Sequence, residues 1–178
     1  MSQDHGHTLT ELLITLAVAG TVAVLGAPAF AALIASSRLT AELNALHHVL
    51  HSGRREAIKR RLNLVLCQST DGARCTGEAD WSEGWILFVD SDDDGMPDAT
   101  PSEPVLHRHD SPGAVTIRTN RQRYTLRGLR RRGTNGTFLV CDPAGRVPPR
   151  ALIVSYTGRP RSAPGSDAPA ALDCAEDA

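Results

Sequence analysis

The side chains best suited to bind a metal ion lie in one acidic segment of this 178-residue chain. Aspartates occupy alternate positions, a glycine follows, and one more aspartate comes soon after: Asp90, Asp92, Asp94 and Asp98. Carboxylates in this order match the oxygen ligands of calcium-binding loops. Pro101, however, takes the twelfth position, where such a loop has a bidentate glutamate. We therefore interpret the segment as an acidic hairpin turn, with calcium binding by the four aspartates as the alternative and no other cofactor expected.

Arginine side chains suited to phosphate binding are concentrated in the last third of the chain. Seven lie within fifteen residues, and four follow: Arg118, Arg121, Arg123, Arg127, Arg130, Arg131 and Arg132, then Arg146, Arg150, Arg159 and Arg161. Residues 111–161 carry a net charge of +10, whereas residues 62–110 carry −9. Clustered guanidinium groups bind phosphates in pairs of hydrogen bonds and give salt-sensitive, sequence-independent affinity for DNA. The alternatives are that these arginines solvate a sheet face or pair with the acidic residues 62–110.

The chain contains four cysteines, an even number that favours disulfides in an exported domain. Cys67 and Cys75 enclose a turn-rich loop, and a Cys141–Cys174 bond would tie down the C-terminal tail. Three pairings are possible, and we favour Cys67–Cys75 with Cys141–Cys174 because a strand end and a turn bring the first pair together. The alternative is four buried free thiols in a reducing compartment.

Histidines and catalytic motifs give no indication of an enzyme. His47 and His51 lie one helical turn apart, a spacing that can hold a metal, but no acid or cysteine nearby completes a site. His107 and His109 have no nucleophile beside them, and the sequence lacks the Gly-x-Ser-x-Gly, phosphate-loop and His-Glu-x-x-His patterns. We therefore predict a protein without catalytic activity.

An uncharged run from Leu12 to Ser37 can form a membrane-spanning helix. Its apolar part, Leu12–Ile34, has 23 residues, and a helix rises about 1.5 Å per residue across a hydrocarbon core of about 30 Å. Glu11 precedes the run, and a carboxylate there needs a positive partner unless it lies at the level of the lipid headgroups.

The helix is predicted to continue outside the membrane and to pack on β-strands. Apolar residues recur there at spacings of mostly three, four or seven: Leu39, Leu43, Leu46, Leu50, Ala57 and Leu62. Short β-type runs separated by Gly, Pro, Asp and Ser follow: residues 64–67, 85–89, 105–106, 115–117, 124–126, 137–141 and 151–156. This order predicts an α+β protein, in which a long N-terminal helix, half membranous and half amphipathic, packs on an antiparallel β-rich domain. The tail after Ser162 is predicted to be a loop.

The N-terminal residues Gly6-His7-Thr8-Leu9-Thr10-Glu11-Leu12 resemble the class III signal of type IV pilins and type II secretion pseudopilins. This resemblance implies cleavage by a prepilin peptidase between Gly6 and His7, N-methylation of His7, and retention of Glu11 as the fifth mature residue. The new α-amino group would be the partner of Glu11 in assembly, and Pro28 matches the proline that kinks the family's helix. His7 stands where the family usually has Phe, and residues 1–6 contain no Lys or Arg.

Two further stretches resemble the GspH/FimT minor pilins, in particular the FimT type. One is the Val65-Leu66-Cys67 run followed by Cys75 and by residues 81–90, with their Trp-x-x-Gly-Trp strand. The other is Gly158-Arg159-Pro160-Arg161, which resembles the Gly-Arg-x-Arg element of FimT-type proteins that bind DNA during natural transformation. In this interpretation Pro160 holds the two arginines apart on a stiff exposed loop, and the Arg118–Arg132 cluster supports them. The remaining alternative is that the arginines pair with acidic neighbours in a pilus.

The resemblance implies a division into a leader (1–6), a transmembrane and pilus-core helix (7–37), a pilin-like domain (38–162) and a tail tied by Cys174 (163–178). It implies a minor type IV pilin that binds DNA non-specifically during uptake. The alternative is a structural minor pilin, or a type II secretion pseudopilin, that primes fibre assembly. The expected partners are prepilin peptidase, other major and minor pilins, double-stranded DNA and inner-membrane lipid. The domain is expected in the periplasm of a bacterium, and outside the cell in the assembled pilus.

Overall fold

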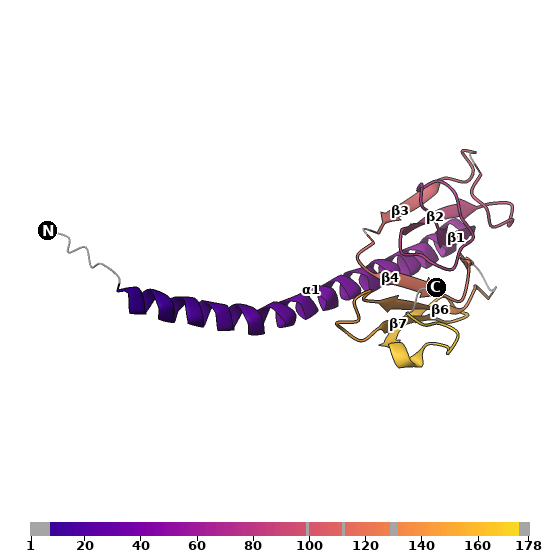
Figure 1. The fold of residues 1–178 in the computed structure, drawn as a ribbon. Coiled ribbons are helices and arrows are strands. Elements are labelled where there is room, and N and C mark those ends of the chain that lie inside the picture. The colour runs from indigo at the N-terminus through magenta and orange to yellow at the C-terminus, as the bar shows by residue number, and fades with distance from the viewer. Residues whose placement is uncertain (1–7, 99, 112, 129–131, 175–178) are drawn as a thin grey trace.

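Helix α1 (Leu9–Arg60) extends along most of the molecule in this computed structural model (Figure 1). Thr8 caps its start, because its Oγ1 accepts a hydrogen bond of 3.3 Å from the Glu11 N–H. Arg61 ends it in the left-handed conformation, with φ of 59°. Pro28 lies inside the helix, where it removes one backbone donor. The structure describes residues 8–98, 100–111, 113–128 and 132–174.

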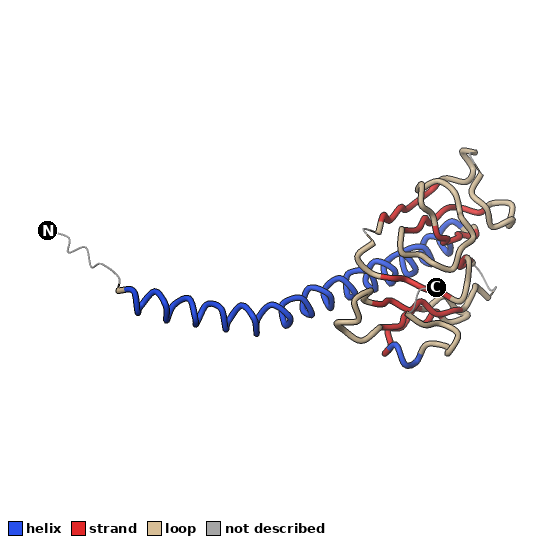
Figure 2. The backbone as a smooth tube through the Cα atoms, viewed as in Figure 1, coloured by secondary structure: helices blue, strands red, loops and turns tan. Residues whose placement is uncertain are grey.

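The N-terminal half of α1 extends away from the rest of the protein (Figure 2). Residues 8–30 are all exposed, although most of them are apolar. By length and composition this half can cross a membrane, and α1 is the one helix of the described residues with that property. An exposed apolar helix of this kind needs lipid or other helices around it.

The C-terminal half of α1 packs against the β-rich domain through one buried stripe. The apolar members of the stripe recur at spacings of three, four or seven residues: Ala35, Leu39, Leu43, Leu46, Val49, Leu50, Gly53 and Ala57. The prediction of an amphipathic continuation is therefore confirmed, with one correction. Leu62 does not belong to the stripe, because the helix has ended and this side chain is 37% exposed.

Two antiparallel sheets of four strands each contact α1. The first has the order β3-β2-β1-β5 and the second has the order β4-β6-β7-β8. All seven predicted β-runs lie in or at the ends of these strands. The bounds are β1 (Asn63–Gln68), β2 (Gly84–Asp90), β3 (Val105–Asp110), β4 (Thr116–Thr119), β5 (Arg123–Leu126), β6 (Gly136–Cys141), β7 (Arg150–Val154) and β8 (Pro160–Pro164).

Strand β8 corrects the predicted loop over residues 158–161 at positions 160–161 and the predicted loop after Ser162 at positions 163–167, whereas residues 158–159 and 168–174 lie outside helices and strands as predicted. β8 pairs with β7 along its whole length, and a short 3₁₀-helix, Gly165–Asp167, follows it. Pro160 and Pro164 are compatible with this strand because β8 is at the edge of its sheet, where a missing N–H costs little.

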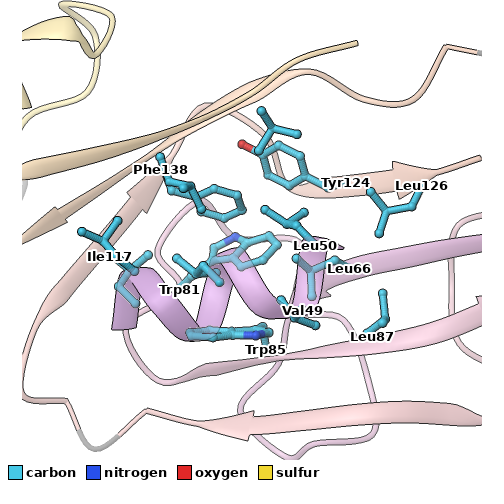
Figure 3. Close-up of a cluster of buried hydrophobic side chains, with 14 of the residues drawn as sticks. Val49, Leu50, Leu66, Trp81, Trp85, Leu87, Ile117, Tyr124, Leu126 and Phe138 are labelled. Carbon is cyan, nitrogen blue, oxygen red and sulfur yellow. The ribbon is translucent and has the colours of Figure 1, made fainter. Parts of the chain in front are cut away.

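The main core lies where α1 meets the inner faces of both sheets (Figure 3). Trp81, Tyr124 and Phe138 form an aromatic group there, next to Leu50 of α1 and Leu66 of β1. The Tyr124 hydroxyl and the Thr119 Oγ1 are hydrogen-bonded at 2.7 Å. Burial raises the pKa of Tyr124 above its ordinary value, so this phenol stays neutral in the core.

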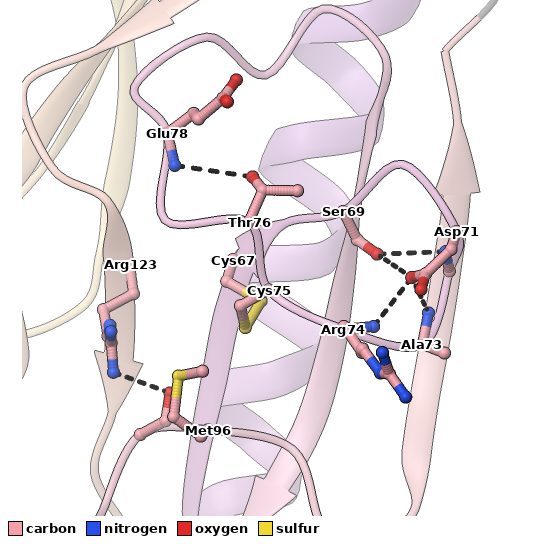
Figure 4. Close-up of a disulfide and its surroundings, with 12 residues drawn as sticks. Cys67, Ser69, Asp71, Ala73, Arg74, Cys75, Thr76, Glu78, Met96 and Arg123 are labelled. Atoms are coloured by element: carbon pink, nitrogen blue, oxygen red, sulfur yellow. Dashed lines mark hydrogen bonds between the residues drawn. A yellow bond between two sulfur atoms is a disulfide. The ribbon is translucent and has the colours of Figure 1, made fainter.

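Both favoured disulfides, Cys67–Cys75 and Cys141–Cys174, are present in the structure. Cys67–Cys75 holds the β1–β2 connection against the outer face of the first sheet (Figure 4). That cover explains why β1 is buried on both faces, whereas a half-exposed strand would alternate. Cys141–Cys174 ties the C-terminal segment to the end of β6.

Candidate nucleic-acid interface

A groove of about 630 Å³ opens where α1, the end of β5 and the β7–β8 turn meet. We call it the arginine groove because three guanidinium groups line it. Its described lining contains no carboxylate and consists of Arg54, Leu126, Arg127, Gly128, Arg132, Gly133, Tyr156, Thr157 and Gly158. The undescribed residues 129–131 lie between two of these segments in the sequence.

The β7–β8 turn forms one wall of the arginine groove and is fixed by short hydrogen bonds. The Gly158 N–H donates to the Ser155 carbonyl at 2.8 Å, and the Ser155 N–H donates to the Arg159 carbonyl at 3.1 Å. A Cβ on Gly158 would lie 3.1 Å from Arg54 Nη1, so the turn lies directly against the helix arginine. Arg159 follows the lining residue Gly158 in this turn, and its side chain is exposed.

Positive charge from the helix and from the turn acts on the same region. The pKa of His51 is lowered by partial desolvation and by the nearby charges of His47, Arg55, Arg54 and Arg159, in that order. Beside the same turn, the Arg132 guanidinium lies 5.7 Å from the centre of the Tyr156 ring, within cation–π range. The described lining of the groove is therefore electropositive and also offers an aromatic face.

Arg159 and Arg161 do not occupy equivalent positions. Arg159 lies in the turn beside the groove, whereas Arg161 is in β8, directly opposite Ile153 of β7. Leu152 of β7 belongs to the core with α1, so the neighbouring residue Ile153 faces the other way. Residues directly opposite each other in an antiparallel pair share a face, so Arg161 is on the outer face of its sheet.

Most of the predicted arginine cluster is distributed over other parts of the surface. Arg118 is half-buried in β4, and Arg130 and Arg131 lie outside the described residues. Arg121 Nε donates to the Asn135 carbonyl (3.1 Å), and Arg123 Nη1 donates to the Gly95 carbonyl (2.9 Å). Arg127 Nη1 donates to Asp93 Oδ2 (3.1 Å), and Arg150 Nη1 donates to Thr40 Oγ1 (2.9 Å). Arg123 and Arg127 thus meet the acidic segment, as one of the alternative interpretations expected; Arg123 reaches it beside Met96 (Figure 4).

Arg146 is bound to Asp142 and is expected to make stability depend on pH. Hydrogen bonds from the Arg146 guanidinium, opposed by burial of the carboxylate, lower the pKa of Asp142 to about 2. Because the folded-state pKa is depressed, the stabilisation is complete above the ordinary pKa and is lost as pH falls towards 2. We expect a contribution of about 1–2 kcal/mol, reduced by solvent around the partly exposed Arg146.

Urea unfolding of the protein between pH 5 and pH 2 measures this effect. In Asp142→Asn the free energy of unfolding should depend less on pH across that range than in the wild type. Asp167→Asn removes an exposed carboxylate from the 3₁₀-helix and is the matched control, with the wild-type pH dependence expected. Equal slopes for the wild type and Asp142→Asn would contradict the assignment.

Sequence patterns did not identify Arg54 and Tyr156 as members of the groove. Arg54 belongs to the basic part of α1, where residues 38–61 carry a net charge of +4. That charge did not indicate which residues lie next to Arg54 in the fold. Tyr156 is the partly exposed aromatic residue that follows β7. The two residues are brought together only by the packing of the second sheet on the helix.

The histidines noted in the sequence contact other side chains of the fold. The His47 and His51 rings lie 4.6 Å apart on α1, without a cysteine or acid completing a metal site among the described residues. His109 stacks on Trp85 at 4.0 Å, and its Nε2 is 2.9 Å from Glu42 Oε2 of α1. His109 therefore connects the edge strand of the first sheet to the helix.

The four predicted calcium ligands are not all brought together. Among the described residues, the carboxylates of Asp90, Asp92 and Glu103 converge within 4.8 Å of one another. Asp94 instead accepts a hydrogen bond from the Met96 N–H at 2.7 Å. Asp98 is exposed, and Glu103 was not recognised as a member because it lies beyond the twelve-residue loop pattern.

The two-sheet, single-helix architecture is shared with solved minor pilins. Type IV minor pilin FimU of Pseudomonas aeruginosa superposes in two crystal forms, with TM-scores of 0.51 and 0.54 and sequence identities of 24% and 21%. Each match covers 76% of this chain and 97% or 95% of FimU. The minor pseudopilin EpsH from the type 2 secretion system of Vibrio cholerae matches at 11% identity and a TM-score of 0.46, over 73% of this chain and 99% of EpsH.

A family model described as the type II transport protein GspH matches residues 42–158, more than half of the chain. The protein therefore belongs to the GspH family. By family and fold it is a minor pilin or pseudopilin, a structural component of type IV pili or type II secretion systems. A search of curated protein sequences gives no match to it.

Proposed function

We propose that this minor pilin binds double-stranded DNA without sequence preference, as part of a type IV pilus, during DNA uptake in natural transformation. The observation that carries the proposal is the arginine groove, where three arginines line one hollow and Arg159 lies at its edge. Several guanidinium groups around one hollow suit the phosphates of a DNA strand, and bases play no part in such contact.

The charge of the groove is better placed for a ligand than the arginines elsewhere. Among the described residues, Arg54 and Arg132 of the groove and the neighbouring Arg159 form no ion pair with a carboxylate. Arg127, which also lines the groove, is paired with Asp93, and Arg146 is bound to Asp142. DNA binding releases counterions from the duplex for each phosphate that an arginine neutralises, so available guanidinium groups determine the affinity. Tyr156 beside Arg132 adds a surface on which a backbone sugar can lie.

We also propose how the N-terminus of the protein is processed and where it lies in the membrane. Gly6 and His7 lie outside the described residues, and cleavage between them with methylation of His7 remains our expectation for the mature protein. Glu11 then lies in the first turn of α1 at the start of the exposed apolar half, where the new α-amino group would be its partner. The proposal includes cleavage by prepilin peptidase, insertion in the inner membrane with a periplasmic domain, and packing with other pilins.

DNA binding by the full oxidised chain in non-ionic detergent tests the proposal. We expect duplex DNA of any sequence to bind, with affinity that falls steeply as salt rises. Arg54→Ala/Arg132→Ala/Arg159→Ala should weaken binding on the order of 10- to 100-fold and reduce the slope of log K against log salt by about 0.9 for each phosphate that is no longer neutralised. Fluorescence anisotropy of a labelled duplex at several salt concentrations measures both quantities.

A charge-matched control separates the groove from net charge. Arg38→Ala/Arg74→Ala/Arg108→Ala removes three exposed arginines from other surfaces and should change affinity less than about threefold. Arg161→Ala tests the outer face of the second sheet separately. Equal losses in the two triple variants would show that only net charge matters, and absence of binding at low salt would exclude the proposal.

The second candidate is a purely structural minor pilin or pseudopilin that primes fibre assembly. The exposed apolar half of α1 favours it, because that surface is available for packing with the helices of other pilins. In this case the arginine groove would contact acidic surfaces of neighbouring subunits. The DNA titration distinguishes the two candidates, because only the first requires the free protein to bind a duplex.

A further inference from the structure

Asp90, the last residue of β2, is a buried carboxylate without a compensating positive charge. Its side chain is 2% exposed, and its Oδ1 has no hydrogen-bond partner among the described residues. Burial of a charged oxygen is unfavourable unless a hydrogen bond, an ion pair or a metal satisfies it. The turn hydrogen bonds of the following segment satisfy other aspartates, such as Asp94, but leave this atom without a partner.

Two more carboxylates face the same point. The oxygens of Asp90, Asp92 and Glu103 lie within 4.8 Å of one another, although Glu103 comes from the far end of the β2–β3 connection. Glu103 is itself 4% exposed and is held in place by the backbone: its Oε1 accepts from the Ser91 N–H at 2.7 Å, and its Oε2 accepts from the Asp98 N–H at 3.2 Å.

The basic side chains that reach this segment bind other residues of it than the three converging carboxylates. Residues 90–103 contain six acidic residues and no Lys, Arg or His. Arg127 forms its ion pair with Asp93, and Arg123 donates to the Gly95 carbonyl. In the described part of the chain no ion pair reaches the three converging carboxylates. Three like charges this close repel each other unless protons or a cation neutralise them.

We propose that Asp90, Asp92 and Glu103 bind a calcium ion at the base of the β2–β3 connection. All donors are oxygens, which excludes a preference for the softer metals that bind through sulfur and imidazole. Calcium accepts several carboxylates in irregular geometry, whereas magnesium requires a near-octahedral shell and retains its water. Three carboxylates supply up to six oxygens, and water or loop carbonyls complete the shell. A bound ion would compensate the buried Asp90 carboxylate, whose Oδ1 has no hydrogen-bond partner among the described residues.

This ligand set differs from the sequence pattern, because Glu103 replaces Asp94 and Asp98. The proposal is independent of DNA binding, since none of its ligands lines the arginine groove. It also explains why a buried glutamate is held by backbone N–H groups at the end of a surface loop. Those hydrogen bonds fix the carboxylate so that it faces Asp90 and Asp92.

Calcium titration of the full oxidised chain, freed of metal with a chelator and kept in detergent, tests the site. Isothermal calorimetry with calcium chloride should show one site with a Kd of about 10⁻⁴–10⁻³ M, the range of extracellular calcium modules. Excess calcium should raise the melting temperature of the domain by about 4 °C. Magnesium chloride at the same concentration should have a smaller effect, and an equal effect would contradict a calcium site.

Matched variants in the same loop identify the ligands. Asp90→Asn and Glu103→Gln should abolish both the calorimetric heat and the melting shift. Asp94→Asn and Asp98→Asn remove the same charge from the loop and should retain both within about threefold in Kd. If Asp90→Asn does not fold, Glu103→Gln decides the matter. Absence of a calcium response in the wild type, or equal losses in all four variants, would overturn the proposal.

Discussion

Replacement of Trp81 by alanine is expected to lower the free energy of unfolding by about 3–5 kcal/mol. The side chain is fully buried, and its ring meets the edges of Tyr124 and Phe138 at centroid distances of 5.9 and 5.1 Å. Its backbone N–H donates to the Ile117 carbonyl at 2.8 Å. Tyr124 belongs to the first sheet, and Phe138 and Ile117 belong to the second. The cavity left by the substitution would therefore lie where the two sheets meet.

Urea unfolding of the oxidised chain in detergent, followed by circular dichroism, measures the loss. Tyr156→Ala is the control, because that aromatic side chain is 55% exposed and its removal should cost less than about 1 kcal/mol. Trp81→Phe should lie between the two, since it retains part of the edge contacts. A loss below about 1 kcal/mol for Trp81→Ala, without a change in the slope against urea, would contradict the role of this residue.

The fold could largely be predicted because its main elements are long or strongly patterned. The uncharged run and the apolar stripe of α1 follow one helical period, so their continuation into the domain needed no tertiary information. β8 could not be predicted, because an edge strand with Pro160, Arg161 and Pro164 buries little and lacks β-type residues. Its strand geometry comes from pairing with β7, which is a tertiary effect.

The candidate sites were harder to predict because their members are far apart in the sequence. Counting neighbouring arginines suggested one cluster, but the strands direct them to several faces, and Arg123 and Arg127 bind the acidic segment instead. Arg54 joins the groove from α1, about a hundred residues before Arg159. Likewise, a fixed-length loop pattern could not include Glu103, because only the closure of the β2–β3 connection brings it to Asp90.

Substitution of Gly84 by alanine is expected to destabilise the domain by about 2–4 kcal/mol. Gly84 begins β2 with φ of +140°, a conformation that residues with a side chain rarely adopt. A Cβ at this position would also collide with the carbonyl oxygen of His109 in the adjacent strand β3. The backbone strain and the clash both destabilise the variant. The clash can be relieved only by moving β2 away from β3. The glycine of the Trp-x-x-Gly-Trp stretch is therefore required by strand pairing and not only by a turn.

Gly145→Ala separates the two causes of this loss. Gly145 also has a positive φ, of +63°, but a Cβ there would meet nothing within 4 Å. Its substitution should cost only the backbone strain, about 1 kcal/mol. The difference between the two variants in urea unfolding then contains the contact with the His109 carbonyl together with the greater backbone strain at the φ of +140° of Gly84. Since that carbonyl belongs to backbone paired across β2 and β3, it cannot move aside as a flexible side chain does. Equal losses would show that strain alone, and not the approach of β3, determines the need for glycine at position 84.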